Sequence, residues 1–299
     1  MDPTWYAKIY GAPEDADIFD EKTWHLANPS LGKTIDIETV RQEALAARNS
    51  ETSERLFRWL RLNQWVANKT ASWMPLTLWD SRQSELAPSD LVGKRCYAGI
   101  DLSSTTDLSS VALVFPPQDG LDHYYCFTEQ WIPKDNMKQR VLRDKVPYDR
   151  WAKCGHIHVT PGDVIDYDYI KARLIALNQQ YEVAGWGNDP YGAEKLRQDL
   201  DREADIQLIE VKQDIAHHNG PAKEIERLLK IGALYHDTNP VTRWAFGNTT
   251  VVTDGNENYK LKKISKVNRI DPMVALVNAM YICLKLEEGE SRIREVTAI

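Results

Sequence analysis

The sequence predicts an α/β fold, a mixed β-sheet flanked by helices, preceded by a small helical arm rich in tryptophan. Residues 1–92 hold six of the ten tryptophans and show only helical periodicity. Three apolar runs between 96 and 130 favour antiparallel strands, and from 156 onward strands alternate with amphipathic helices. We therefore expect two parts, a helical arm over 1–92 and an α/β domain over 93–299.

The arm is expected to form two helices. The first is "DIETVRQEALAARN", which Asp36 can cap at its N-terminus. The second is "SERLFRWLRLN", where Leu56, Trp59 and Leu60 fall on one face. Because tryptophan is buried in most environments, we expect Trp59 and Trp65 to lie inside the arm.

The α/β domain is predicted element by element from its periodicity. Strands are expected at 96–101, 110–116 and 122–130, followed by a helix at 134–145 and a short strand at 156–159. Then come a helix "YDYIKARLIALNQQY", a strand at 183–189, a helix "YGAEKLRQDLDRE", a strand at 206–211 and a helix "AKEIERLLKIG". A basic β-hairpin over 250–264 and an apolar helix from Asp271 complete the series.

Composition is that of a water-soluble globular protein. The chain is 42% hydrophobic and 27% charged, and no apolar run approaches the roughly 20 residues that span a bilayer. The N-terminus has no basic region followed by an apolar one, so we expect no secretory signal and no membrane association. The four cysteines are scattered without zinc-ligand spacing, which favours reduced thiols in a cytosolic protein.

The net charge of −7 argues against a generally basic surface, yet one segment is strongly basic. "NYKLKKISKVNRI" contains no acid and carries Lys260, Lys262, Lys263, Lys266 and Arg269. Such a strip can follow the phosphates of DNA. A solvated hairpin explains the same residues, and the pattern alone leaves both interpretations open.

Carboxylates stand at three notable positions. Asp101 ends the strand "CYAGID", Asp189 ends "VAGWGND", and Asp271 opens the last helix, whose apolar face must pack on the same sheet. Ligands of such sheets bind outside the carboxyl ends of the strands. Three carboxylates there would repel one another, but Mg²⁺ or Mn²⁺ ions, which prefer oxygen ligands, remove that objection. Two such ions can catalyse phosphodiester hydrolysis.

Each of these acids also has a purely structural explanation. Asp189 and Asp271 both precede proline, and Asp-Pro is a common helix start in which the aspartate is the N-cap. Asp107, a weaker metal-ligand candidate in "SSTTD", can be a turn residue. Only the joint placement of the three at one sheet edge favours a metal site.

Two other motifs are set aside. "NPSLGKT" resembles a phosphate-binding P-loop, but the required first glycine is replaced by Ala27, so no ATP site is expected. His217 and His218 are adjacent on an expected loop, which is poor geometry for a metal and favours a surface role.

Several segments together resemble the large terminase subunit of tailed double-stranded DNA bacteriophages, over nearly the whole chain. They are "DEKTWHLANPSLG", "NQWV", "WMPLTLWD", "AGIDLSSTTDLSSVALVF", "GNDPYGA", "GALYHDTNPVTRWAFGN" and "NRIDPMVALVNAMYI". That family joins a packaging ATPase to a C-terminal nuclease of RNase H-like fold. With no Walker motif present, this chain is expected to begin after the ATPase core, as a nuclease portion with its linker, and to have no ATPase activity.

The resemblance implies a Mg²⁺- or Mn²⁺-dependent endonuclease that cuts concatemeric DNA when packaging starts and stops, in the cytoplasm of the infected bacterial host. By resemblance, Asp101, Asp189 and Asp271 match the acidic triad that holds two divalent cations, and Asp107 falls where some relatives carry a further acid. The basic strip would grip backbone phosphates with little sequence preference. The implied partners are double-stranded DNA, the portal protein, the small terminase subunit and the ATPase portion.

Two rival functions are compatible with the same residues. A resolvase or transposase-like enzyme uses the same kind of carboxylate site, although the tryptophan-rich arm argues against it. Alternatively the chain is a non-catalytic module that docks through residues 1–92 to a motor, a small subunit or the portal, with acids that only cap helices. Branched-DNA preference would support the first, and stability that does not respond to metal would support the second.

Overall fold

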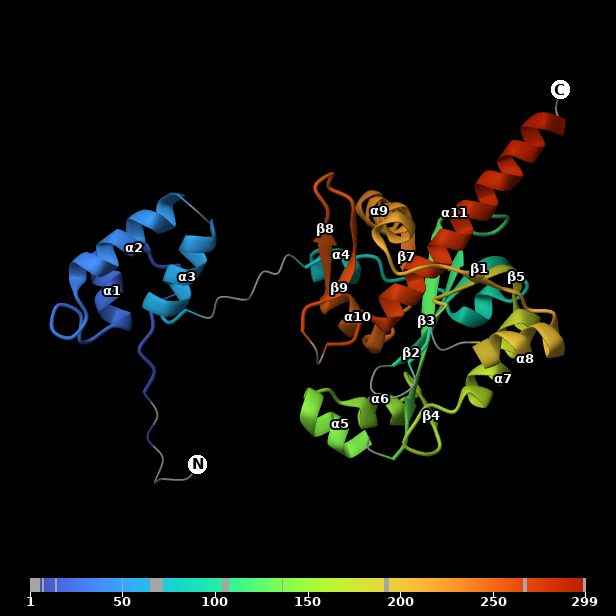
Figure 1. Cartoon of the computed structure of the whole chain (residues 1–299), viewed down its shortest axis with the longest axis horizontal. Helices are drawn as coiled ribbons and strands as arrows, with labels where there is room; N and C mark the ends of the chain where they lie inside the picture. The colour runs from blue at the N-terminus through green and yellow to red at the C-terminus, as the bar shows by residue number, and fades with distance from the viewer. Residues whose placement is uncertain are drawn as a thin grey trace. The chain divides into compact units, whose positions relative to one another are not determined.

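The computed structural model describes residues 6, 8–13, 15–49, 51–64, 72–103, 108–135, 137–190, 194–265 and 268–297. It forms two compact units, Met1–Lys69 and Thr70–Ile299 (Figure 1). Of the described helices, none is both long and apolar enough to cross a bilayer.

The division falls earlier than the expected boundary at 92/93. The segment from Trp73 to Leu91 belongs to the second unit, where Trp79 is buried and stacks on His236 with ring centroids 3.8 Å apart. Trp79 also lies 4.6 Å from Phe246. Two of the six tryptophans assigned to the arm, Trp73 and Trp79, are therefore core residues of the α/β unit.

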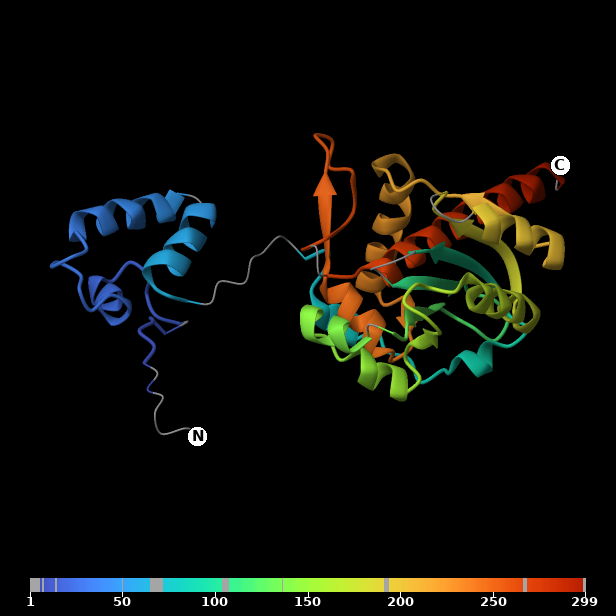
Figure 2. The same cartoon turned by 60° about the horizontal axis from the view of Figure 1, so that its bottom comes forward.

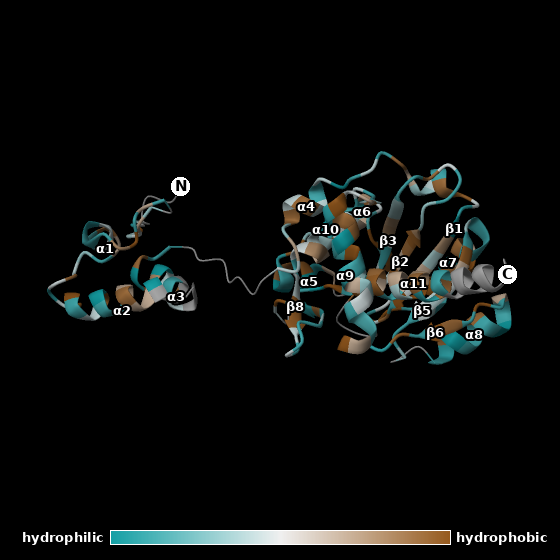
Figure 3. Cartoon of the chain, turned by 90° about the horizontal axis from the view of Figure 1, so that it is seen from above, coloured by the Kyte–Doolittle hydropathy of each residue, from teal (hydrophilic) through white to brown (hydrophobic). Residues whose placement is uncertain are grey.

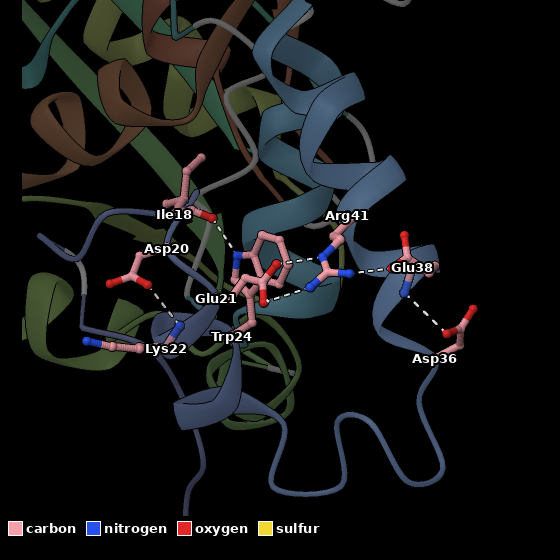
Figure 4. A network of polar contacts seen from close by, with 8 residues as sticks. All are labelled: Ile18, Asp20, Glu21, Lys22, Trp24, Asp36, Glu38 and Arg41. Carbon is pink, nitrogen blue, oxygen red and sulfur yellow. Dashed lines mark hydrogen bonds and ion pairs between the residues drawn. The ribbon is translucent and has the colours of Figure 1, made fainter.

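The first unit packs three helices, α1 (Glu21–Ala27), α2 (Ile37–Asn49) and α3 (Glu51–Arg61), around Trp24 and Phe57. Those two rings meet edge to face at 5.9 Å. The predicted cap is confirmed, because Asp36 Oδ1 accepts from the Glu38 backbone N–H at 3.2 Å. Figure 4 shows Arg41 of α2 donating to Glu21 of α1 and to Glu38, so ion pairs as well as apolar contacts join the helices.

The prediction that Trp59 lies inside the arm is wrong for this unit, since its side chain is 59% exposed. The inward residues of α3 and the turn after it are Phe57 and Leu62, and the face with Leu56, Trp59 and Leu60 points away from the unit's core. Trp65 lies outside the described residues.

The second unit is built on the predicted mixed sheet, in the strand order β4-β3-β2-β1-β5-β6, with β7 also pairing with β3. Strands β1, β2 and β3 are antiparallel, and β5 and β6 continue the sheet in parallel from β1. Strands β4 and β7 pair with β3 in parallel. The strands are β1 (Arg95–Asp101), β2 (Ser109–Phe115), β3 (Tyr124–Pro133), β4 (His158–Thr160), β5 (Glu182–Asn188), β6 (Leu208–Glu210) and β7 (Leu234–His236).

Helices cover both faces of this sheet. On one face lie α4 (Leu76–Asp80), α9 (Ile215–Ile231), α10 (Pro240–Gly247) and α11 (Asp271–Thr297), which share one apolar core. On the other lie α7 (Tyr167–Gln180) and α8 (Glu194–Ala204). Figure 2 shows α11 running along the sheet, and Figure 3 shows mainly hydrophobic strands beside a mainly hydrophilic α8. The remaining elements are a 3₁₀ turn (Pro88–Leu91), α5 (Met137–Asp144), α6 (Tyr148–Lys153), β8 (Thr249–Thr253) and β9 (Tyr259–Lys263).

Helix α11 approaches the central strands unusually closely. A Cβ atom at Gly99 would lie 2.1 Å from the Ala275 carbonyl oxygen, and one at Gly187 would lie 2.7 Å from Cγ1 of Ile282. Only glycine allows this approach, because it has no side chain. The Asn278 side chain fixes the register by donating from Nδ2 to the Ile100 carbonyl oxygen at 2.9 Å.

Helix α9 differs most from its prediction. It begins at Ile215, where the Asp214 side chain caps it by accepting from the His217 N–H, and it continues through Pro221. A proline inside a helix removes one backbone hydrogen bond, so the pattern predicted only the part that follows it. His217 and His218 are therefore helical rather than on a loop, and His218 is buried, which contradicts the expected surface role.

Candidate functional site

Two of the three predicted aspartates lie at the ends of neighbouring parallel strands. Strand β1 pairs with β5 so that Ile100 lies opposite Asn188, and Asp101 and Asp189 therefore come next at the same edge. Side chains alternate between the faces of a sheet. Gly99 and Gly187 face α11, so Asp101, two residues further within β1, is directed to that same face, and continued alternation past the end of β5 would direct Asp189 there too. Both side chains are partly buried.

The third aspartate reaches the same edge by another route. The Tyr97 hydroxyl donates to Glu287 at 2.6 Å, whereas Ile100, later in β1, bonds to Asn278, earlier in α11. Helix and strand thus run in opposite directions, and the start of α11 lies toward the end of β1. Asp271 occupies that start and is only 8% exposed. The positive end of the helix dipole favours a carboxylate there.

The three acids share an edge and a face of the sheet, but the structure does not show them as a closed group of ligands. Across the ranges described above, no three His, Cys, Asp or Glu side chains are grouped so that they could hold a metal ion. Asp107 lies outside the described residues. As a set of donors, carboxylates at a sheet edge suit a hard divalent cation.

A loop from distant sequence closes over Asp101. The Gln213 side chain donates from Nε2 to Asp101 Oδ1 at 3.2 Å, and the Lys260 ammonium donates to the Gln213 carbonyl oxygen at 2.8 Å. The same loop is anchored to β5, because the Val211 N–H donates to the Asn188 carbonyl oxygen at 2.8 Å. Gln213 was not among the residues predicted from the sequence, and its only signal is its place just after strand β6.

Lys260 also belongs to the electrostatic surroundings of a buried histidine. Burial, together with the nearby charge of Lys260, lowers the pKa of His218 to about 4. His218 is therefore neutral near pH 7 and adds no positive charge to this edge of the sheet.

Among the described residues of the predicted basic strip, Arg269 differs from the three lysines in being buried. Lys262 is exposed on β9, and Lys260 and Lys263 are partly exposed. Arg269 is only 4% exposed and lies 3.6 Å from the Asp144 carboxylate, so the structure does not support it as a surface contact for DNA. Its burial follows from its place just before α11, where the chain enters the interior. Lys266 lies outside the described residues.

Asp144, the partner of Arg269, is a buried anchor below the start of α11. Its side chain is enclosed, and Arg143 donates to it at 2.6 Å and Tyr148 at 3.2 Å. Burial alone would raise the pKa of Asp144, but the bond from Arg143 and the charge of Arg269 outweigh it and hold that pKa below its usual value. Asp144 therefore stays ionised and fixes the segment that leads to Asp271.

A separate polar pocket lies on the α7 face, with Glu129, His158 and Asp237 in its lining. Burial would raise the pKa of Glu129, but hydrogen bonds from Arg173 and His158 lower it to about 2. Asp237 has the opposite behaviour, because burial raises its pKa to about 7. The pocket is separate from the three aspartates, which are directed to the α11 face.

Comparison with known proteins agrees with this geometry. Residues 1–287 match the family model described as terminase large subunit, endonuclease domain. The chain is 29% identical over 278 residues to the large terminase subunit of Enterobacteria phage HK97, covering 92% of this chain and 54% of that protein. It is 30% identical over 292 residues to protein YmfN of Escherichia coli K12, covering 95% and 64%.

The fold agrees as well. The crystal structure of the HK97 bacteriophage large terminase superposes with a TM-score of 0.64 and 27% identity, covering 91% of this chain and 56% of that one. The predicted mixed sheet with flanking helices, of the RNase H-like kind, is thereby confirmed. This chain spans about half the length of the HK97 terminase. By its family match over almost all of its length, the chain belongs to the endonuclease domain family of the large terminase subunit.

Proposed function

We propose that this chain is a metal-dependent endonuclease that cuts concatemeric double-stranded phage DNA at the start and end of packaging. The observation that carries the proposal is the placement of Asp101 and Asp189 on one face and edge of the sheet, with Asp271 at the start of the helix that packs there. Family membership supports DNA cleavage as the activity. It also favours a terminase over a resolvase or transposase-like enzyme.

In this proposal Asp101, Asp189 and Asp271 would hold two divalent cations, Mg²⁺ or Mn²⁺, with Asp107 as a further candidate ligand. When bound, such ions supply an activated water and stabilise the charge that develops on the phosphate. The chain's own contribution is to hold acids from two strands and one helix at a single edge. Their mutual repulsion favours cation binding, because a cation lowers the cost of ionising all three.

Strand β9 would bind backbone phosphates through Lys260, Lys262 and Lys263, with Lys266 of the same basic segment as a further candidate. The bond from Lys260 to Gln213, which itself contacts Asp101, supports this role. Contacts with phosphates fix position and carry no base sequence, so cleavage would show little sequence preference and weaken with salt. In the infected host cytoplasm the portal protein, the small terminase subunit and the ATPase portion would be the partners that bring DNA to the site.

The test is nicking and linearisation of supercoiled plasmid with Mn²⁺, Mg²⁺ or EDTA, comparing the wild type with Asp189→Asn. Asparagine can still cap a helix but weakens cation binding. Asp168→Asn is the matched control, because Asp168 has a 74% exposed side chain on α7, at the opposite face. We expect metal-dependent cleavage by the wild type and the control, and a folded but inactive Asp189→Asn.

Wild-type activity in Asp189→Asn would remove Asp189 from the site. Inactivity of all three proteins would be followed by calorimetric titration with Mn²⁺. Binding by the wild type that is weakened in Asp189→Asn would support a metal site in an isolated nuclease that is silent. Absence of binding would favour a docking module whose acids only cap helices.

A further inference from the structure

Ser110 is the cross-strand neighbour of Asp101. Strands β1 and β2 are antiparallel, and their register places Asp101 directly opposite Ser110. Residues opposite each other in an antiparallel pair project to the same face, with Cβ atoms about 4.5–5.5 Å apart. Ala112, two residues further along β2, contributes to the core beneath α11, so Ser110 is on the α11 face beside the aspartate.

The Ser110 hydroxyl is fully buried, with 0% exposure, and among the described residues its Oγ makes no hydrogen bond. By contrast, the hydroxyl of its neighbour Ser109 makes hydrogen bonds in both directions. Ser109 Oγ accepts from the Ser103 N–H at 3.0 Å and donates to the Ser103 carbonyl oxygen at 3.2 Å. A buried hydroxyl without a partner is unfavourable, so its presence beside a candidate ligand calls for an explanation.

Asp101 already has one positioning partner on another side. Gln213 Nε2 donates to Asp101 Oδ1, and Lys260 holds the Gln213 main chain from the β9 strand. Carboxylates that ligate metals are usually themselves hydrogen-bonded, because such bonds fix which oxygen faces the ion. Gln213 supplies one such bond, and Ser110 is placed to supply another.

We propose that Ser110 is a positioning residue of the metal site, whose hydroxyl donates to the Asp101 carboxylate when that carboxylate holds a cation. The proposal rests on the proposed function, because it needs a cation at Asp101. It does not make Ser110 a ligand, and it assigns the residue no contact with DNA. Loss of such an outer hydrogen bond typically weakens metal binding 10- to 100-fold.

The test compares Ser110→Ala with the matched pair Ser110→Thr and Ser110→Val, which have the same shape and differ in one hydroxyl. Two quantities are measured, the Mn²⁺ dissociation constant by calorimetry and the unfolding midpoint in EDTA. We expect Ser110→Ala to bind Mn²⁺ at least about tenfold more weakly while its metal-free midpoint stays equal or rises, since it removes an unpaired hydroxyl. Ser110→Thr should bind Mn²⁺ several-fold more tightly than Ser110→Val. Gln213→Ala gives a benchmark for losing a hydrogen bond to Asp101.

A purely structural role for Ser110 would lower the metal-free midpoint and leave Mn²⁺ affinity unchanged, which would overturn the inference. Equal Mn²⁺ affinities of the threonine and valine variants would also overturn it, and that comparison holds even if the added methyl group destabilises both. If the wild type itself bound no Mn²⁺, the proposed function would fail together with this inference. If the wild type bound Mn²⁺ and Ser110→Ala bound it equally tightly, the role of Ser110 would be refuted and the proposed function would stand.

Discussion

Replacement of Gly99 by alanine tests how closely α11 must approach the sheet. The new Cβ atom would lie 2.1 Å from the Ala275 carbonyl oxygen and 2.3 Å from the Ala279 nitrogen. Both are backbone atoms of a helix, so no side chain can rotate to make room. Normal contact distances of about 3.5 Å would require α11 to move outward by more than about 1 Å.

The energetic consequence is large because the moving surface is entirely buried. Ala275, Leu276 and Ala279 of α11 have no exposed surface, and an outward shift would weaken their contacts along β1. Overpacking costs about 1–3 kcal/mol when side chains can adjust, so a clash with helix backbone should cost at least about 3 kcal/mol. The same shift displaces Asp271, so Mn²⁺ binding should weaken in the fraction that stays folded.

Gly220 provides the control. It lies within α9, and a Cβ atom added there would meet no atom within 4 Å apart from its chain neighbours and the backbone of its own helix. Alanine is a better helix former than glycine, but the Pro221 ring that follows disfavours the helical conformation of a residue with a Cβ atom, so Gly220→Ala should change the free energy of unfolding by less than about 1 kcal/mol. Urea unfolding gives the free energies, and hydrogen exchange of peptides from β1 identifies the transition of the second unit. A Gly99→Ala protein within about 0.5 kcal/mol of the wild type would refute the close-packing argument.

Two further predictions concern the hairpin and the second pocket. Lys262→Ala and Lys263→Ala should each weaken DNA binding regardless of base sequence and reduce the slope of log affinity against log salt concentration by about one. Lys230→Ala is the control and should leave that slope unchanged, because Lys230 forms an ion pair with Glu226 near the end of α9. Unchanged slopes in the β9 variants would show that β9 does not contact phosphates. For Asp237, the folded-state pKa of about 7 lies above its ordinary value of 3.8, so the folded protein binds the extra proton and loses stability as pH rises from about 4 to 7. Asp237→Asn should remove that loss, with a gain of at most about 4 kcal/mol at pH 8 and little at pH 4; equal unfolding free energies of variant and wild type at pH 8 would contradict the burial of this carboxyl.

The sheet was largely predictable because its central strands carry a strong local signal. The run from 96 to 101 was expected as a strand and is β1, Arg95–Asp101. Short elements were missed for the opposite reason. Strand β7 has only three residues, and it exists because β3 offers a free edge for it, which is a tertiary fact. The start of α9 at Ile215 was not predicted, because Pro221 is expected to break a helix and the helix was therefore expected to begin after it.

At the site, the sequence could indicate the acids but not the residues around them. A carboxylate at the end of an apolar strand is visible in the chain, whereas Gln213 and Ser110 meet Asp101 only through the fold. Gln213 is 112 positions away along the chain, and the register between β1 and β2 cannot be counted across an unknown turn. The burial of Arg269 was not predictable either, because a run of basic residues does not show where the chain turns inward.

The two-residue period of the strands relates the close packing of α11 to the position of the acids at this edge. The close approach of α11 requires glycine at 99 and 187, and strand alternation then directs the residues two positions later to the same face. Because α11 runs opposite to β1 and begins two helical turns before Asn278, those positions lie beneath its first turns. In the proposed site, acids at those positions would lie toward Asp271 and the positive end of the helix. A buried strand such as β1 can therefore end in a carboxylate. Gly99 packs against α11, and Asp101, the next residue on the same face of the strand, lies at the edge of the sheet where the proposed site is.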